Sequence, residues 1–355
     1  MNGPGSDPTP DGGPIPKRVL ILQTAFLGDV VLTLPLVKRA HELWPDTQLI
    51  PLTLPSTASI FEDHPGVVES MTWDKHGADR GLFGMLRIAR EIRSRNVDLA
   101  LIPHRSFRSA LLMTLAGVKR RIGFAHVPGS PLYTHRVFRD EEAHEGAKNL
   151  SLLGQFDTEI SPKPVLATHP QAAAEVKEWM KKEKLAGDNI IAIAPGSVWA
   201  TKRWPETYWV VLARKLKESG HSAVFVGGPE DRELSLRIRE AALGENIHVS
   251  AGELSVRGSS ELLRFCRLLI TNDTAPLHLA VAVQTPVLAI FGPTLPEFGF
   301  APTGPSDRIV GLDLECRGCA IHGSDRCPLG HHDCMVRLLP AEIYSIAVEM
   351  LEETA

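Results

Sequence analysis

A ten-residue stretch in the second half of the chain combines a strand end, a polar turn and a helix start. It reads TNDTAPLHLA, residues 271–280, and follows a short apolar run typical of a buried parallel strand. Pro276 suits the first turn of a helix, which Asp273 or Thr274 can cap. A helix N-terminus offers free N–H groups and a positive dipole end, so the turn predicts a phosphate site, with His278 one turn further in. An ordinary capped helix is the alternative.

Two further strand-end turns have the composition of a nucleotide site. The sequence PGS, residues 195–197, ends in Ser197 and leads to KRWP, in which Lys202 supplies a mobile positive charge. A solvated basic loop before a helix is the alternative reading. In VGGPE, residues 226–230, Glu230 can accept hydrogen bonds from a ribose or simply begin a helix near its positive dipole end.

The first strand of the chain, residues 18–23, is followed by the turn TAFLGD. Gly28 permits a tight turn or the close approach of a ligand. Asp29 stands just before an expected helix over 30–44, with a kink expected at Pro35. The carboxylate can therefore be a general base or merely the N-cap of that helix.

Arginines follow the expected strand 97–103. Arg105 and Arg108 lie there with His104 beside them. Arginine suits bidentate contact with phosphate or carboxylate, which an acidic acceptor would require. A basic surface cluster is the common alternative.

Four of the five cysteines gather near the C-terminus. They are Cys316, Cys319, Cys327 and Cys334, interleaved with His322, His331 and His332. The spacing resembles a zinc knuckle, although the second pair is separated by six residues and lacks the usual CxxC. Structural zinc, reduced structural thiols, a disulfide pair and a redox function all stay open.

Two absent motifs restrict the chemistry. No GxxxxGK[ST] sequence occurs, so an ATPase P-loop is not supported. No Asp-x-Asp pair follows a strand where it would hold Mg²⁺ on a diphosphate. If a diphosphate leaves here, a helix dipole and Lys202 must carry its charge instead.

Length and composition are those of a soluble protein of about two domains. The 355 residues carry a net charge of −4, which gives no global indication of nucleic-acid binding, and no apolar run reaches the eighteen residues of a membrane span. Residues 1–16, rich in Gly, Pro and Asp, are expected to be a disordered leader and not a signal peptide. A cytoplasmic location follows, with cysteines not paired for secretion.

Strand and helix patterns alternate along both halves, which predicts an α/β fold with two doubly wound domains. A Pro-rich segment, 161–170, is a reasonable linker, and residues 340–353 form a final amphipathic helix. In such sheets ligands bind beyond the carboxyl ends of the strands. The active site is therefore expected in a cleft between two Rossmann-like domains.

Taken together, the motifs resemble a known family. RVLILQTAFLGDVVLTLPLVKRA, PGSVWATKRWP, VGGPED, TNDTAPLHLAVAVQTPVLAIFGPT and the ending CRGC…CPLGHHDCM are similar to glycosyltransferase family 9, the ADP-heptose:lipopolysaccharide heptosyltransferases. The Cys/His-rich ending is most similar to that of heptosyltransferases II. The resemblance runs from about Lys17 to the C-terminus. It implies a GT-B fold and inverting, metal-independent transfer of L-glycero-D-manno-heptose from an ADP donor to the inner core of lipopolysaccharide.

The resemblance also implies an arrangement of domains. Residues 17–165 would bind the Kdo/heptose-lipid A acceptor and residues 166–339 the ADP-sugar, while 340–355 would cross back to the first domain. Because the acceptor is a lipid and no anchor is visible, peripheral contact with the inner face of the inner membrane is expected. No nucleic-acid partner is implied.

By position, the resemblance assigns roles to single residues. Asp29 would be the general base, Lys202 would meet the diphosphate, and Glu230 would approach the ribose. The donor's phosphates and sugar would lie against Asp273, Thr274, Ala275 and His278. Many relatives carry Ser-Gly or Thr-Gly in place of Thr274-Ala275, which leaves the individual phosphate contacts open. Alternatives are a first or later heptose, another nucleotide sugar, or a nucleotide-binding or zinc-ordered module without catalysis.

Overall fold

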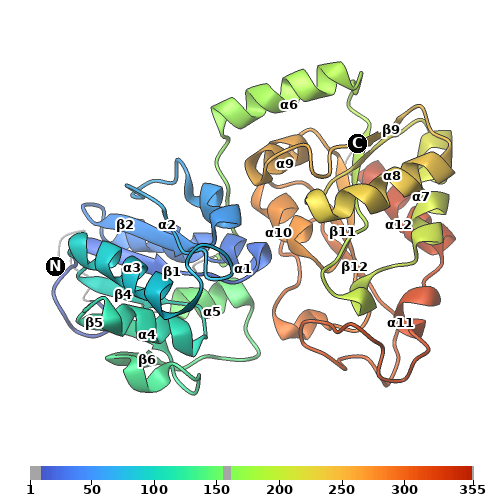
Figure 1. The fold of residues 1–355 in the computed structure, drawn as a ribbon. Coiled ribbons are helices and arrows are strands. Elements are labelled where there is room, and N and C mark those ends of the chain that lie inside the picture. Colours follow the sequence, from blue (N-terminus) through green and yellow to red (C-terminus); the bar gives the residue numbers. More distant parts are fainter. Residues whose placement is uncertain (1–8, 155–160, 354–355) are drawn as a thin grey trace. The chain divides into compact units, whose positions relative to one another are not determined.

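The computed structural model describes residues 9–154 and 161–353. The chain divides into two compact units, Met1–Pro164 and Val165–Ala355, one residue before the expected boundary. Each unit is built on a six-stranded parallel sheet (Figure 1). The predicted fold class, two doubly wound α/β domains, is confirmed.

The sheet of the first unit has the order β3-β2-β1-β4-β5-β6. Leu20 in β1 lies between Ile50 in β2 and Ala100 in β4. Helices cover both faces of a parallel sheet, which explains why its inner strands are continuous apolar runs and not alternating ones. The strands are β1 (Arg18–Leu22), β2 (Gln48–Thr53), β3 (Met71–Thr72), β4 (Leu99–Ile102), β5 (Arg120–Phe124) and β6 (His135–Val137).

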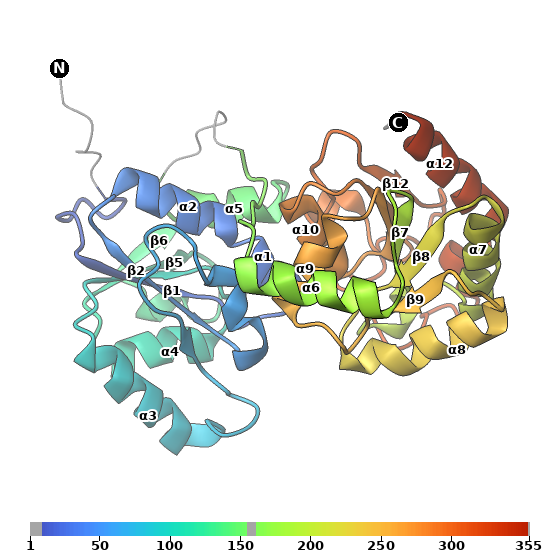
Figure 2. The ribbon, with the colours of Figure 1, turned by 90° about the horizontal axis from the view of Figure 1, so that it is seen from above.

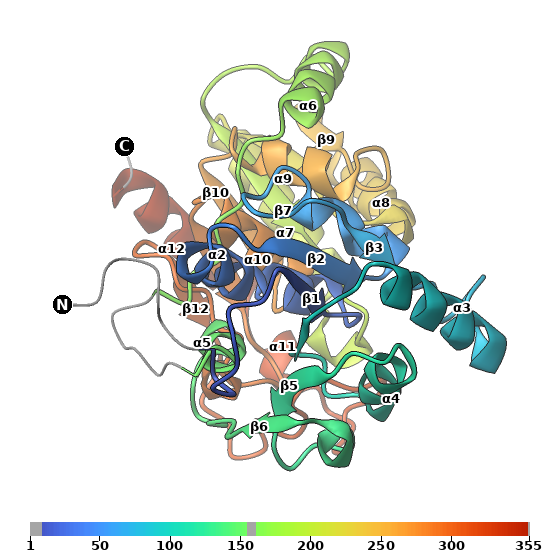
Figure 3. The same cartoon turned by 90° about the vertical axis from the view of Figure 1, so that its left-hand side faces the viewer.

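Helices α2 and α5 lie on one face of this sheet and α3 and α4 on the other (Figures 2 and 3). The expected single helix over 30–44 is two helices, since Pro35 occupies the first turn of α2 instead of kinking a longer one. The helices are α1 (Leu27–Val31), α2 (Leu34–Leu43), α3 (Gly81–Ser94), α4 (Phe107–Leu115) and α5 (Glu145–Ser151), with short 3₁₀ turns η1 (Pro55–Phe61) and η2 (Ser130–Leu132).

The second unit repeats the topology, with the order β12-β11-β10-β7-β8-β9. When its strands are numbered from one and read from the opposite edge of the sheet, the order is 3-2-1-4-5-6, the same as in the first unit. The strands are β7 (Ile190–Ala194), β8 (Ser222–Phe225), β9 (Ile247–Val249), β10 (Leu268–Asn272), β11 (Val287–Ile290) and β12 (Arg308–Val310). Trp204 and Trp209, in edge-to-face contact, anchor the core on one side of the sheet.

Helices again cover both faces of the sheet in the second unit. They are α6 (Pro170–Lys182), α7 (Glu206–Glu218), α8 (Arg232–Ala242), α9 (Val256–Leu263), α10 (Ala275–Ala282), α11 (Asp333–Val336) and α12 (Pro340–Glu353), with 3₁₀ turns η3 (Ala200–Lys202), η4 (Pro229–Asp231) and η5 (Pro296–Phe298). The final helix packs on α7 and β10 and buries Ile343 and Ala347 there. Its crossing back to the first domain stays a prediction.

The expectation of a disordered leader over 1–16 is wrong for residues 9–16. Asp11 accepts a 2.7 Å hydrogen bond from Arg120 Nε, and the same guanidinium donates to the carbonyl of Pro14. This charge pairing, which composition does not reveal, holds a Gly- and Pro-rich segment against β5. Residues 1–8 lie outside the described residues. Within the described part of the chain, no helix has the length and apolar character to cross a bilayer.

Candidate active site

Both sheets reverse their strand order at one point, and most of the candidate residues follow the strands on either side of it. The reversal falls between β1 and β4 in the first unit and between β7 and β10 in the second. Neighbouring loops run in opposite directions at such a point and leave a crevice beyond the carboxyl ends of the strands. Four of the predicted motifs follow these four strands.

Asp29 lies in the first turn of α1, just beyond β1. Phe26 is the N-cap of that helix, so the alternative role of Asp29 as an N-cap is wrong. Burial raises the pKa of Asp29 to about 6, and the like charge of Glu145 adds to this effect, while Arg105 opposes it. Among the described residues the carboxylate has no ion-pair partner. A carboxylate with this pKa is suited to accept a proton near neutral pH.

The backbone that carries Asp29 is held by buried polar side chains. Thr33 Oγ1 donates to the carbonyl of Asp29 at 2.8 Å, and Asn149 Nδ2 on α5 donates to the carbonyl of Leu32 at 3.0 Å. Gly28, the predicted acceptor contact, is buried inside α1. Its contact with an acceptor stays a prediction.

The loops after β3 and β4 bring cations to the same end of this sheet. Arg105 and Arg108 are exposed there, and the guanidinium of Arg108 stacks over the Trp73 ring at 5.5 Å. Lys75, which the sequence analysis missed, donates from Nζ to the carbonyl of Thr24 at 2.6 Å. The edge is therefore suited to an acidic ligand.

His104 lies among these cations but carries no charge at neutral pH. Burial, together with Lys75 and Arg105, lowers its pKa to about 4. Its Nδ1 is 3.1 Å from Thr24 Oγ1 and 2.7 Å from Ser109 Oγ, so the ring joins the loop after β1 to α4.

In the second unit a buried ion pair links the ends of β7 and β10. Lys202 Nζ lies 2.6 Å from Asp273 Oδ2 and also donates to the Asp273 carbonyl at 3.2 Å. Thr294, another residue that sequence reasoning missed, donates from Oγ1 to the same carboxylate oxygen at 2.7 Å. Two predicted donor-site residues therefore meet, and the lysine is fixed at the carboxyl end of the sheet.

The N-terminus of α10 has no side-chain cap, which corrects the expectation that Asp273 or Thr274 would provide one. Thr274 is the N-cap residue, but its hydroxyl donates back to the Asn272 carbonyl at 3.4 Å. Asp273 is turned toward Lys202 instead. Ala275 and Pro276 form the first turn, and His278 is buried with its ring 6.4 Å from that of Phe300. First-turn N–H groups without a side-chain acceptor suit a phosphate.

Asn272 holds the loop after β7 against this turn. Its Nδ2 donates to the Pro195 carbonyl at 2.8 Å, and its Oδ1 accepts from the backbone N–H of Trp204 at 3.3 Å. Ser197 lies buried in that loop and accepts from the N–H of Trp199.

At the VGGPED turn the predicted Glu230 is exposed. The neighbouring Asp231 is directed inward: its carboxylate accepts from the Gly228 N–H, and a side chain at Gly196 would collide with it. The two glycine turns therefore meet through Asp231, which sequence reasoning missed.

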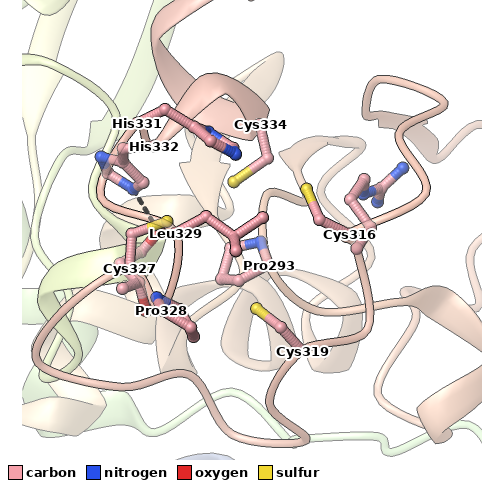
Figure 4. A pocket seen from close by; sticks show the side chains of 11 residues that line it. Pro293, Cys316, Cys319, Cys327, Pro328, Leu329, His331, His332 and Cys334 are labelled. Atoms are coloured by element: carbon pink, nitrogen blue, oxygen red, sulfur yellow. Dashed lines mark hydrogen bonds between the residues drawn. The ribbon is translucent and has the colours of Figure 1, made fainter.

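The four C-terminal cysteines line one small cavity of about 30 Å³ (Figure 4). All five thiols of the chain are free. The side chain of Leu329 lies among the sulfurs, and no three His, Cys, Asp or Glu side chains of the described residues converge as a metal site requires. Burial raises the pKa of Cys334 to about 11. At Cys327 burial opposes ionisation, but the backbone around 329–332 lowers the pKa overall.

The cysteine segment is hydrogen-bonded to the segment that carries Lys202. Thr201 Oγ1 donates to the Ser324 carbonyl at 2.8 Å and accepts from the Ser324 N–H. The Thr201 carbonyl lies 2.7 Å from His332 Nε2. The position of Lys202 thus depends on the loop that holds the thiols.

Two parallel sheets of this order, with a carboxylate after one reversal point and a helix N-terminus suited to phosphate after the other, are the arrangement of the GT-B fold. The model of glycosyltransferase family 9 (heptosyltransferase) matches residues 85–327, and the chain belongs to this family.

Relatives and solved structures match over most of the chain. Lipooligosaccharide heptosyltransferase 2 of Campylobacter jejuni is 25% identical, covering 95% of this chain and 99% of that protein. Lipopolysaccharide heptosyltransferase 1 of Pseudomonas aeruginosa is 28% identical, covering 85% of this chain and 86% of that protein. The structure of ADP-heptose lps heptosyltransferase II of Escherichia coli has a TM-score of 0.76 at 20% identity, covering 95% and 100% of the two chains.

Proposed function

We propose that this protein transfers a heptose from ADP-heptose to the inner core of lipopolysaccharide, with inversion at the sugar carbon. The proposal depends on what lies at the two reversal points. In the first unit this is Asp29, a carboxylate with a raised pKa. In the second unit it is Lys202, held in place by Asp273, and the uncapped N-terminus of α10. The names of the relatives supply the sugar, the nucleotide and the acceptor class.

In this mechanism Asp29 accepts the proton of an acceptor hydroxyl as its oxygen attacks the anomeric carbon. The bond from that carbon to the diphosphate oxygen breaks, and ADP leaves with the electron pair. The first turn of α10 and the remaining N–H of Lys202 stabilise the negative charge that develops on the diphosphate. Direct displacement from one side inverts the anomeric centre, and it requires one base and no metal ion.

The second heptose is the transfer that we favour, because the Cys/His-rich ending is most similar to that of heptosyltransferases II. The test measures ADP release from ADP-heptose with inner-core acceptors that carry no heptose or one. Turnover only on the one-heptose acceptor supports this assignment, and turnover only on the heptose-free acceptor makes the protein the first transferase. No turnover on either acceptor, together with tight ADP binding, indicates that the donor carries another sugar. No turnover together with no nucleotide binding favours the zinc-ordered module without catalysis.

We also propose peripheral contact with the inner membrane, through the start of α3. Leu82 and Phe83 are 61% and 87% exposed, and the exposed Arg80 and Arg90 lie on the same segment. Apolar side chains beside arginines suit the surface of an anionic bilayer.

Vesicles that contain an anionic phospholipid test this contact. Phe83→Ser is expected to weaken binding to them, while turnover of a lipid-free acceptor stays unchanged. Leu243→Ser is the matched control, since Leu243 is 77% exposed in the second unit. Equal binding of both variants would exclude this face.

Structural zinc at the four C-terminal cysteines stays a prediction from their spacing in the sequence. The thiols share one cavity but do not converge as ligands, so no catalytic step is assigned to an ion there. Elemental analysis of the purified protein tests for zinc, and activity after dialysis against a chelator tests metal-independent catalysis. Loss of transfer that leaves the melting temperature unchanged and is restored only by a divalent ion would contradict the proposed mechanism.

A further inference from the structure

A cluster of buried charges lies behind Asp29 and has no role in the mechanism so far. Glu145 begins α5, and its Oε2 is 2.9 Å from Arg139 Nη2 and 3.7 Å from Lys148 Nζ. All three side chains are less than a tenth exposed. Arg139 also reaches Glu141, which is 70% exposed.

The cluster is fastened to the helix that carries Asp29. Glu145, Lys148 and Asn149 are spaced i, i+3 and i+4, so they share one face of α5. Asn149 binds the carbonyl of Leu32, which is the C-cap residue of α1, and α5 packs along α2. The placement of Glu145 relative to Asp29 is therefore fixed by hydrogen bonds and packing.

Stability alone does not account for this arrangement. Apolar side chains of similar volume usually stabilise a protein as well as a buried ion cluster does, or better. Charges buried beside a site that needs a perturbed carboxylate have a functional explanation. The charge of Glu145 on α5 raises the pKa of Asp29, and that of Arg105 in the loop after β4 lowers it, while Asp29 in turn raises the pKa of Arg139 in the segment after β6.

We propose that Glu145 is a positioning residue for the transfer reaction: clamped by Arg139 and Lys148, it holds negative charge beside Asp29 and so maintains Asp29 as an effective base. This inference rests on the proposed role of Asp29. Because Arg139 and Lys148 are occupied by Glu145, neither forms an ion pair with Asp29 among the described residues. Such an ion pair would weaken the base.

The experiment compares pH profiles of kcat/KM for Glu145→Gln, Glu145→Asp and Glu141→Gln. Removing the charge of Glu145 lowers the pKa of Asp29, so the acid limb of the profile moves down by on the order of half a pH unit or more. Turnover on the plateau falls severalfold because the base is weaker. The KM for ADP-heptose stays unchanged. Glu145→Asp retains the limb, and Glu141→Gln, which removes an exposed carboxylate from the same arginine, behaves as wild type.

A purely structural role would lower the melting temperature of Glu145→Gln without moving the acid limb, and that result overturns the inference. If Glu145→Gln does not fold, Lys148→Met takes its place, and loss of this cation is expected to move the limb to higher pH. A limb that does not move in Lys148→Met likewise overturns it. An Asp29→Asn protein with wild-type turnover defeats the proposed role of Asp29 as the base, on which this inference rests, whereas an inactive one with an unmoved limb in Glu145→Gln defeats only this inference.

Discussion

The two units share one strand order and place a carboxylate at the same kind of position, yet the two carboxylates are opposite in state. Asp273 is bound by Lys202 and Thr294, so its charge is compensated within 3 Å. Asp29 has a like-charged neighbour in Glu145 and a pKa raised to about 6. The same scaffold thus holds a carboxylate with no ion-pair partner among the described residues in one unit and a carboxylate that anchors a lysine in the other.

The largest effect expected from this comparison is that of Asp29→Asn. Removing the base is expected to lower kcat by roughly 10³-fold, within the usual range for general-base catalysis. The ADP affinity of the second unit should stay at the wild-type value. Steady-state ADP release and calorimetric ADP titration measure the two quantities. A variant that loses both would show that the two carboxylates are not functionally separate.

Lys202→Met tests the other half of the comparison. Loss of one charge-stabilising group is expected to lower kcat/KM for the donor by roughly 10²-fold. It also leaves Asp273 buried without its cation, which costs about 3–5 kcal/mol of stability.

The double variant Lys202→Met/Asp273→Asn separates these two effects. Stability should recover in urea unfolding, because no buried charge is left unpaired, while donor turnover should not. Recovery of turnover together with stability would mean that Lys202 serves the fold alone.

The pH dependence of stability gives a third test, in which the sign is set by the raised pKa. Folded Asp29 holds its proton up to about pH 6, whereas the unfolded carboxyl releases it near 3.8. The unfolding free energy contributed by Asp29 is therefore highest below about pH 4, falls as the pH rises to 6, and stays low above it.

Asp29→Asn removes the free-energy cost of ionising a buried carboxyl in the folded protein. At pH 7.5 the variant is expected to be more stable than wild type by about 3 kcal/mol, a difference that disappears near pH 4. Urea unfolding at the two pH values measures it. An Asn variant that is less stable at pH 7.5 would contradict the unpaired state of Asp29.

The smallest effect is expected from Thr294→Val. The change removes one hydrogen bond to the Asp273 carboxylate, worth about 1.5 kcal/mol because the acceptor is charged, so the donor KM should rise roughly tenfold. Thr294→Ser keeps the hydroxyl and serves as the control. If both variants bind the donor equally well, the orientation of Asp273 does not depend on this hydroxyl.

The sequence was sufficient for the fold class, since long apolar strands alternate with amphipathic helices along both halves. The edge strands β6 and β12 were missed because each has three residues and lies among polar ones. Motifs at the reversal points were also predictable, because parallel strands bring their carboxyl ends together. What local patterns could not supply were pairings across the chain: Asp11 with Arg120, Asp273 with Lys202, and Glu145 behind Asp29.

The hydrogen bonds that join Thr201 to Ser324 and His332 couple the cysteine loop to the segment that carries Lys202, the residue proposed to bind the donor diphosphate. Such coupling is reciprocal. If the conformation of the loop changes the affinity for the donor by some factor, bound donor changes the conformational equilibrium of the loop by the same factor. We expect the hydrogen-bonded conformation of the loop to favour donor binding, so that saturation with ADP-heptose makes the loop open less often. Alkylation of Cys327, whose thiolate the backbone favours, should then be slower. The alkylation rate of this thiol would then report the occupancy of the nucleotide site.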